Sequence, residues 1–140
     1  MKYRALVFED EKLLLEVFQH ALEIRGYEVF GYTEPSKCRL ISEDKFFCQG
    51  KDNCSYADFI ITDHFMPGMT GIELVKYLKE RKSNIKNIAI ISGRLREEDI
   101  KIAEDLGCKV FIKPVELPVL FKWLDEGEKK ISPERELIDF

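Results

Sequence analysis

The chain has 140 residues, the length of one domain and enough to bury a single core. Its formal net charge of −4 argues against the clustered positive charge that phosphate-backbone binding needs, so no nucleic-acid partner is expected. No apolar run approaches the roughly 20 residues of a membrane span, and the N-terminus enters a strand-like run without a signal-peptide core. We therefore expect a cytoplasmic protein that does not contact a membrane.

Short apolar runs alternate with longer amphipathic ones along the chain. Residues 3–8 carry four consecutive apolar side chains, which is typical of a strand covered on both faces. Further strands are predicted at 28–32, 57–63, 88–91 and 109–112. Helices are predicted at about 11–25, from 35 through 41, and at 71–81, 96–106 and 116–129, and Gly26 and Gly107 mark two of the helix ends.

Two segments fall outside this alternation. Residues 43–56 are polar and indicate a loop inserted before the third strand, and residues 131–140 indicate a short charged tail. We therefore expect one domain at 1–130, with no effector domain. Five strands that alternate with five helices predict an α/β fold, a parallel sheet with helices on both faces.

Polar residues gather where the predicted strands end. Glu9 and Asp10 follow the first strand, Asp63 the third, Ser92 the fourth and Lys113 the fifth. In doubly wound sheets, the working site lies beyond the carboxyl ends of the strands. Any one of these groups alone could be a solvated turn residue, a helix cap or surface charge. Their joint occurrence at four strand ends instead predicts one site.

Carboxylates crowded at such an edge repel one another unless a cation joins them. Mg²⁺ prefers carboxylate oxygens and keeps room for waters and a phosphate oxygen. One carboxylate would then act as nucleophile, while the lysine and the hydroxyl contact the transferred oxygens. These are the parts of an in-line phosphoryl transfer.

Four stretches of the sequence resemble the signatures of response-regulator receiver domains, the CheY-like family of two-component signalling. They are VFEDE at Val7–Glu11, IITDHFMPGMTGIEL at Ile60–Leu74, AIISG at Ala89–Gly93 and VFIKP at Val110–Pro114. The similarity extends over about residues 3–129. It implies a flavodoxin-like, doubly wound sheet with strand order 2-1-3-4-5, and a stand-alone receiver with a cysteine-containing insertion.

The resemblance also implies roles for the residues at the strand ends. Asp63 would be the phosphoacceptor, and Asp10 and Asp63 would bind Mg²⁺ directly. Glu9 would hold metal-bound water, and the backbone carbonyl of Phe65 would complete the protein's share. Ser92 and Lys113 would bind the phosphoryl oxygens, next to a cis peptide bond between Lys113 and Pro114.

The same resemblance implies partners rather than a conventional enzyme. The donor would be a sensor histidine kinase or a phosphotransfer protein, and the chain itself would catalyse the transfer and a slow dephosphorylation. Output to a downstream protein would use the fourth helix, fifth strand and fifth helix. The sequence does not decide between a monomer and a homodimer.

Several positions depart from the family pattern. Glu9 replaces the commoner Asp, and Phe65 offers no side-chain group to align a hydrolytic water. Arg94 could reach the phosphoryl group or lie in solvent. Val110 stands where an aromatic residue commonly turns inward on activation, with Phe111 beside it on the opposite sheet face, so the usual aromatic switch is not expected.

The cysteines suggest a second group of hypotheses. Cys38, Cys48 and Cys54 have the spacing C-x₉-C-x₅-C, which lacks the tight pair of most zinc sites. Free thiols, a Cys48–Cys54 bridge and a Cys38–Cys54 bridge all remain open, and Cys108 is needed for none of them. We expect a local elaboration far from Asp63. The alternative function is a phosphorylation-independent adaptor, or a redox or metal sensor, acting through these cysteines.

An enzyme class with a similar sheet is the other competitor. Haloacid-dehalogenase-like phosphatases use an Asp-x-Asp motif after a strand. Here Phe65 stands where the second Asp would be, which argues against that class.

Overall fold

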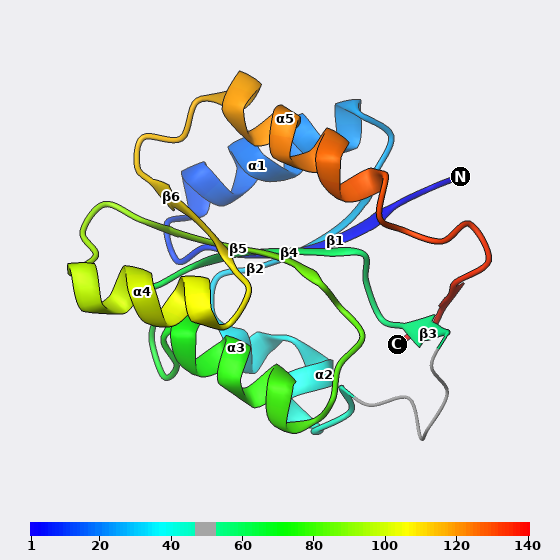
Figure 1. Cartoon of the computed structure of the whole chain (residues 1–140), viewed down its shortest axis with the longest axis horizontal. Helices are drawn as coiled ribbons and strands as arrows, with labels where there is room; N and C mark the ends of the chain where they lie inside the picture. The colour runs from blue at the N-terminus through cyan, green and yellow to red at the C-terminus, as the bar shows by residue number, and fades with distance from the viewer. Residues whose placement is uncertain (47–52) are drawn as a thin grey trace.

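A five-stranded parallel sheet forms the middle layer of the molecule (Figure 1). The structure is a computed structural model that describes residues 1–46 and 53–140. The strands lie in the order β2-β1-β4-β5-β6. They are β1 (Arg4–Phe8), β2 (Glu28–Tyr32), β4 (Phe59–Asp63), β5 (Asn87–Ser92) and β6 (Lys109–Ile112). Because β4, β5 and β6 are the third, fourth and fifth predicted strands, the predicted order 2-1-3-4-5 is confirmed.

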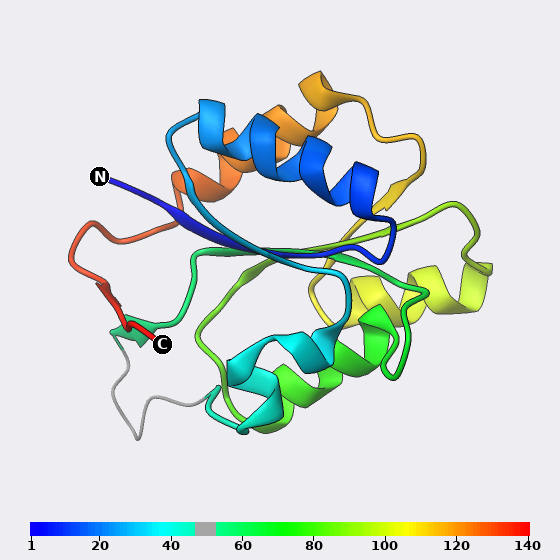
Figure 2. The same ribbon diagram turned by 180° about the vertical axis from the view of Figure 1, so that it is seen from behind.

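Helices cover both faces of this sheet, as predicted (Figures 1 and 2). One face carries α1 (Lys12–Ile24) and α5 (Leu117–Glu128). The other carries α2 (Arg39–Ser42), α3 (Gly71–Glu80) and α4 (Glu97–Asp105). Within the described ranges, no helix is both long enough and apolar enough to cross a membrane.

The sheet separates two apolar cores, which explains the consecutive apolar residues of β1. Successive side chains of a strand point to opposite faces, so a strand with helices on both faces is apolar at every position. Leu6 and Phe8 pack with α3 and α4 residues, whereas Ala5 and Val7 pack with α1 and α5 residues. All five residues of β1 are buried, and so are all those of β4 and β5.

The second predicted helix, 35 through 41, is not continuous. It consists of a 3-10 turn, η1 (Pro35–Lys37), and the single-turn helix α2. Between them, Cys38 has an extended conformation with φ −83° and ψ 121°, which interrupts the helical path. Cys38 is fully buried in the core beneath, so burial of its side chain accompanies the break.

The C-terminal segment, residues 131–140, is packed against the domain, although its sequence suggested a charged tail. Its strand β7 (Glu136–Leu137) runs parallel to β3 (Cys54–Ser55), in the segment expected to be a loop. The backbone N–H of Glu136 donates to the carbonyl of Asn53, and that of Ile138 to Ser55. The aromatic ring of Phe140, which ends the segment, has its centroid 5.0 Å from that of Phe30.

A buried ion pair ties the C-terminal segment to the amino end of β4. The Asp58 side chain is 3% exposed and accepts hydrogen bonds of 2.7 Å from both Nε and Nη2 of Arg135. It also accepts the backbone N–H of Arg4 at 2.9 Å. The Arg4 side chain in turn donates to the carbonyl of Ile138 and to Asp139. Arg135 and Asp139 of this segment therefore have specific partners.

Removing the guanidinium should leave Asp58 as an uncompensated buried charge. We predict that Arg135→Gln lowers the free energy of unfolding by about 3 kcal/mol, the usual cost of breaking a buried ion pair. Arg94→Gln, at an exposed arginine without an ion pair in the described ranges, should change it by less than about 0.5 kcal/mol. Urea unfolding followed by circular dichroism measures both. Equal stability of the two variants would contradict the structural role of the segment.

Candidate functional site

Three carboxylates converge at the carboxyl edge of the sheet, on the right in Figure 2. Glu9 and Asp10 follow β1, and Asp63 ends β4, which pairs with β1 so that Phe8 lies opposite Thr62. One oxygen of each carboxylate lies within 4.8 Å of those of the other two. Glu9 and Asp63 are buried, whereas Asp10 is exposed. The predicted juxtaposition of these three acids is therefore present in the fold.

Lys113 joins this group from the end of β6. Its Nζ lies 2.8 Å from Oε1 of Glu9 and 3.2 Å from Oδ1 of Asp63. Its backbone N–H donates to the carbonyl of Ser92 at 2.9 Å, which holds the residue at the edge of β5. The peptide bond between Lys113 and Pro114 is cis, as the resemblance implies.

Ser92 lies at the same edge, but its hydroxyl is engaged within its own turn. The side chain is almost completely buried at the end of β5. Its Oγ donates to the carbonyl of Arg94 at 2.9 Å and accepts the Arg94 N–H at 3.1 Å. The Arg94 side chain is exposed. A ligand at the carboxylates would therefore have to compete with this turn for the Ser92 hydroxyl.

The loop between β4 and α3 is held by contacts that the sequence analysis missed. Gly71 donates its N–H to the carbonyl of His64. A Cβ at Gly71 would lie 2.6 Å from the carbonyl oxygen of Asp63, so only glycine permits this approach. Thr70 and Glu73 form a capping box that starts α3 at this point. The pattern T-G-x-E after the loop carried that signal.

His64, next to Asp63, was not singled out either. The residue is 6% exposed, and burial lowers the pKa of its imidazole. Its Nδ1 is buried without a hydrogen-bond partner among the described residues. The ring of Phe65 packs edge-on against that of His64, with centroids 4.7 Å apart, but 57% of Phe65 is exposed. Phe65 therefore presents an apolar surface beside the carboxylates, and its backbone carbonyl is the group that the resemblance assigned to the metal.

The crowding of charge changes the acidity of each group. Burial, together with hydrogen bonds to Glu9 and Asp10, raises the pKa of Asp63 to about 8. Burial opposes ionisation of Asp10 as well, but hydrogen bonds with Asp63 and Glu9 hold its pKa below the usual range. Burial would lower the pKa of Lys113, yet the hydrogen bond to Glu9 and the charge of Asp63 raise it.

These residues fit a hard divalent cation. All donors in the acidic group are carboxylate oxygens, the ligands that Mg²⁺ prefers, and the group includes the exposed Asp10 through which an ion could enter. The raised pKa of Asp63 shows that a single lysine does not compensate the carboxylates fully. A cation would supply the missing positive charge.

Cys54 lies away from this edge. β3, which contains Cys54, and the C-terminal segment are at the opposite end of the sheet (Figures 1 and 2). Cys54 is disulfide-bonded, whereas Cys38 and Cys108 are free and buried. The Cys38–Cys54 bridge considered from the sequence is therefore wrong, because Cys38 is a free thiol that packs in the core. Cys48 lies outside the described residues.

Val110, at the position of the usual aromatic switch, and its neighbour Phe111 face opposite layers. Val110 packs against the core beneath α3 and α4, and Phe111 is buried in the core beneath α1 and α5. The ring of Phe111 packs edge-on against Trp123, with centroids 6.0 Å apart. The aromatic side chain of β6 thus already lies inside the second core.

A doubly wound parallel sheet with an acidic group and a lysine at its carboxyl edge defines the class of α/β proteins that bind ligands where strand order reverses. Comparison with known proteins narrows this class. Residues 5–125 match the response regulator receiver domain, so the chain belongs to that family. Receiver domains of this family act in two-component signalling.

Individual relatives agree with this assignment. The polar-differentiation response regulator DivK of Brucella abortus is 24% identical over 121 residues, which cover 84% of this chain and 89% of DivK. An Arabidopsis thaliana protein named as a two-component response regulator, ARR21, is 27% identical over 99 residues. That match covers 71% of this chain but only 15% of ARR21, so the similarity to this longer relative is confined to a small part of it.

Solved structures share the fold. The chemotaxis response regulator CheY4 of Vibrio cholerae superposes with a TM-score of 0.72 at 23% identity, covering 91% of this chain and 99% of CheY4. A response regulator receiver domain protein of Clostridium thermocellum gives a TM-score of 0.74 at 22% identity, covering 91% and 95%. The backbone is thus that of a CheY-like domain.

The raised pKa of Asp63 predicts a pH-dependent Mg²⁺ affinity. Without metal, the folded protein keeps a proton on Asp63 that an unfolded chain loses near pH 4, so this group stabilises the fold below about pH 4 and loses that effect as pH rises through about 8. Mg²⁺ competes with this proton. Its affinity should rise up to about tenfold per pH unit from about pH 6 to 8 and then level off.

Isothermal titration calorimetry in buffers of different ionisation enthalpy would measure both the affinity and the proton release. About one proton should leave per Mg²⁺ bound near pH 7. The Asp63→Asn variant should bind Mg²⁺ more weakly and without this pH dependence. An affinity that stays constant between about pH 6 and 8 would show that Asp63 is ionised before the metal arrives.

Proposed function

We propose that the chain is a phosphorylation-dependent switch that accepts a phosphoryl group on Asp63 with the help of Mg²⁺. The observation that carries the proposal is the approach of Glu9, Asp10 and Asp63 within 4.8 Å, with Nζ of Lys113 at 3.2 Å from Asp63. Family membership supports a signalling role. The donor would be a histidine kinase or a phosphotransfer protein.

Each residue has a definite task in this transfer. An oxygen of Asp63 attacks phosphorus while the bond to the donor nitrogen breaks, and the leaving imidazole takes a proton from solvent. Glu9, Asp10, Asp63 and the carbonyl of Phe65 would hold Mg²⁺, directly or through water. The cation would neutralise charge on the phosphoryl oxygens and keep Asp63 ionised. Lys113 would exchange its contact with Glu9 for a phosphoryl oxygen, and Ser92 would turn toward another.

Asp63 should be the sole phosphoacceptor. Incubation with acetyl phosphate and Mg²⁺ should add about 80 Da, the mass of one phosphoryl group, to the intact protein. The Asp63→Asn variant should show no gain, because an amide cannot form the acyl phosphate. Asp105→Asn, at an exposed carboxylate on α4, is the matched control and should be labelled like the unchanged chain. Full labelling of Asp63→Asn would refute the assignment.

The phosphorylated form should be long-lived, because Phe65 is exposed beside the site and has no group to orient a water. We predict that Phe65→Asn shortens its half-life by about tenfold or more, since acid–base or orienting help usually gives at least that factor. Phe65→Leu, which also lacks a hydrogen-bonding group, should leave the half-life unchanged. Following the loss of the mass gain over time measures both. An equal half-life in all three proteins would contradict the role of Phe65.

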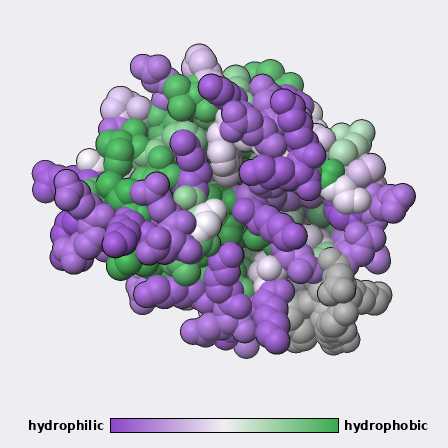
Figure 3. Space-filling model, viewed as in Figure 1, coloured by the Kyte–Doolittle hydropathy of each residue, from purple (hydrophilic) through white to green (hydrophobic). Residues whose placement is uncertain are grey.

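Two apolar surfaces would serve the partners. On the first, Leu13, Val17 and Ile24 of α1 are more than half exposed, and Phe65 is exposed in the loop that follows Asp63. A helical phosphodonor that brings its histidine to Asp63 could cover this surface. The second lies over β6 and the flanking parts of α4 and α5, where apolar side chains gather (Figure 3). Ile112, Val119 and Ile102 are exposed there, which supports a downstream protein on this face.

A further inference from the structure

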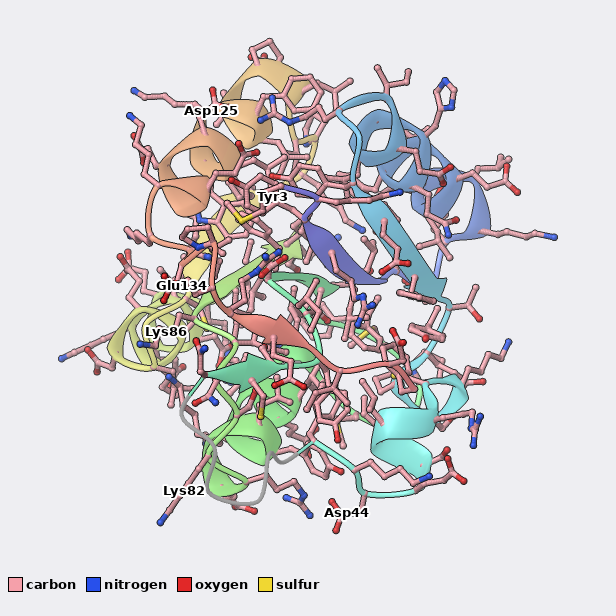
Figure 4. All side chains as sticks on the ribbon, turned by 90° about the vertical axis from the view of Figure 1, so that its right-hand side faces the viewer. Tyr3, Asp44, Lys82, Lys86, Asp125 and Glu134 are labelled. Atoms are coloured by element: carbon pink, nitrogen blue, oxygen red, sulfur yellow. The ribbon has the colours of Figure 1, made fainter. Side chains whose placement is uncertain are left out.

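A cavity of about 220 Å³, lined mostly by polar and charged residue types, lies at the amino end of the sheet, opposite the carboxylates. Its walls come from three stretches that are distant in sequence, within residues 53–58, 84–87 and 130–135. Figure 4 looks onto this end of the molecule, with Lys86 and Glu134 near the β3–β7 pair. Part of the wall is buried, including Ser55, Ala57 and Asn87. The cavity is smaller than the roughly 300–1,000 Å³ of drug-sized sites, so it suits only a small ligand.

The lining carries unbalanced positive charge. Its one carboxylate, Asp58, is neutralised by the two hydrogen bonds from Arg135. Lys86 and Lys130 also line the cavity, and the structure gives neither of them an ion pair among the residues it describes. Glu134 is close in sequence to Arg135 but does not line the cavity. Two exposed lysines therefore border a cavity whose only lining carboxylate is already paired.

Further donors remain available around the same space. Arg135 uses Nε and Nη2 for its contacts, and in the described ranges Nη1 has no partner. Asn53 donates from Nδ2 to the carbonyl of Glu134, which leaves its second amide hydrogen. The hydroxyl oxygen of Ser132 accepts the N–H of Glu134, so the hydroxyl hydrogen can still donate to a ligand. The lining thus combines net positive charge with hydrogen-bond donors, as recognition of an oxyanion requires.

We propose that this cavity binds a small multivalent oxyanion, either a phosphate ester or a dicarboxylate. The anion would bridge Lys86, which precedes β5, and Lys130, which follows α5, and would sit over the paired Arg135. Because these residues belong to separate stretches, the bound anion would fasten the C-terminal segment to the sheet. Anything that binds only the folded form also stabilises it, so the ligand would raise the stability of this end of the domain.

Inorganic phosphate and malonate are the two probes, added to the full chain in EDTA at constant ionic strength. Two-dimensional ¹⁵N NMR spectra would follow the backbone amides up to about 10 mM probe, tenfold above a Kd of about 1 mM. Saturable shifts are expected at residues 53–58, 84–87 and 130–135. Response to both probes assigns a general oxyanion site, and response to phosphate alone assigns a phosphate ester. An equal amount of sodium chloride should produce no such shifts, because it only screens charge.

Matched lysine variants provide the decisive comparison. Lys86→Gln and Lys130→Gln should each weaken binding by roughly two- to fivefold, the range for an exposed ion pair, and the double variant by roughly tenfold. Lys129→Gln makes the same change of charge one residue away, outside the lining, and should bind normally. All three positions of change are exposed lysines, so the four variants should fold, which circular dichroism verifies.

Three results would overturn the proposal. They are the absence of saturable shifts with either probe, equal weakening by Lys129→Gln, and shifts centred on Asp63 and Lys113 instead of the cavity. Repeating the titration with Asp63→Asn separates this site from the proposed phosphoryl site, because binding in the cavity should persist in that variant. The outcome is therefore independent of whether Asp63 accepts a phosphoryl group.

Discussion

The mutual repulsion of three crowded carboxylates, two of them buried, is the constraint on which the candidate site depends. Glu9, Asp10 and Asp63 are forced together by the parallel pairing of β1 and β4, and Lys113 is the cation that contacts two of them. Glu9 reaches Lys113 more closely than Asp63 does, so its longer side chain holds the lysine in the resting site. Filling the site with Mg²⁺ and a phosphoryl group would rearrange this contact first. Without a phosphoryl group, Lys113 is therefore held by Glu9 and Asp63.

That rearrangement would reach the rest of the domain through β5 and β6. Lys113 is attached by its backbone to Ser92, and the Ser92 hydroxyl is tied to the turn at Arg94 that leads to α4. Phe111 is already buried against Trp123, and Val110 is a small, stiff side chain on the other face. A signal that reaches α4 would thus travel by movement of the turn after β5, without an aromatic ring changing its burial.

The sequence was sufficient to predict the five-stranded sheet and the acidic edge, because both follow from local patterns. Unbroken apolar runs mark strands with two covered faces, and Asp63 and Lys113 each follow such a run. The packing of residues 131–140 could not be predicted in this way. It depends on Arg135 meeting Asp58 across 77 residues, and no periodicity signals a pair so distant. The close approach of Gly71 to Asp63 is likewise visible only in three dimensions.

The β3–β7 pair has a consequence for the dynamics of the chain. The pair brings Cys54 next to Glu136, and the sequence between these two residues contains β4, β5 and β6. Because contacts between residues so distant in sequence form late, we expect the pair to form after the central strands have assembled. Two residues per strand give few backbone hydrogen bonds to hold it. It should therefore open and close as a cooperative unit of its own while β1, β4 and β5 stay folded, and amide hydrogens at Glu136 and Ile138 should exchange with solvent sooner than those of the central strands.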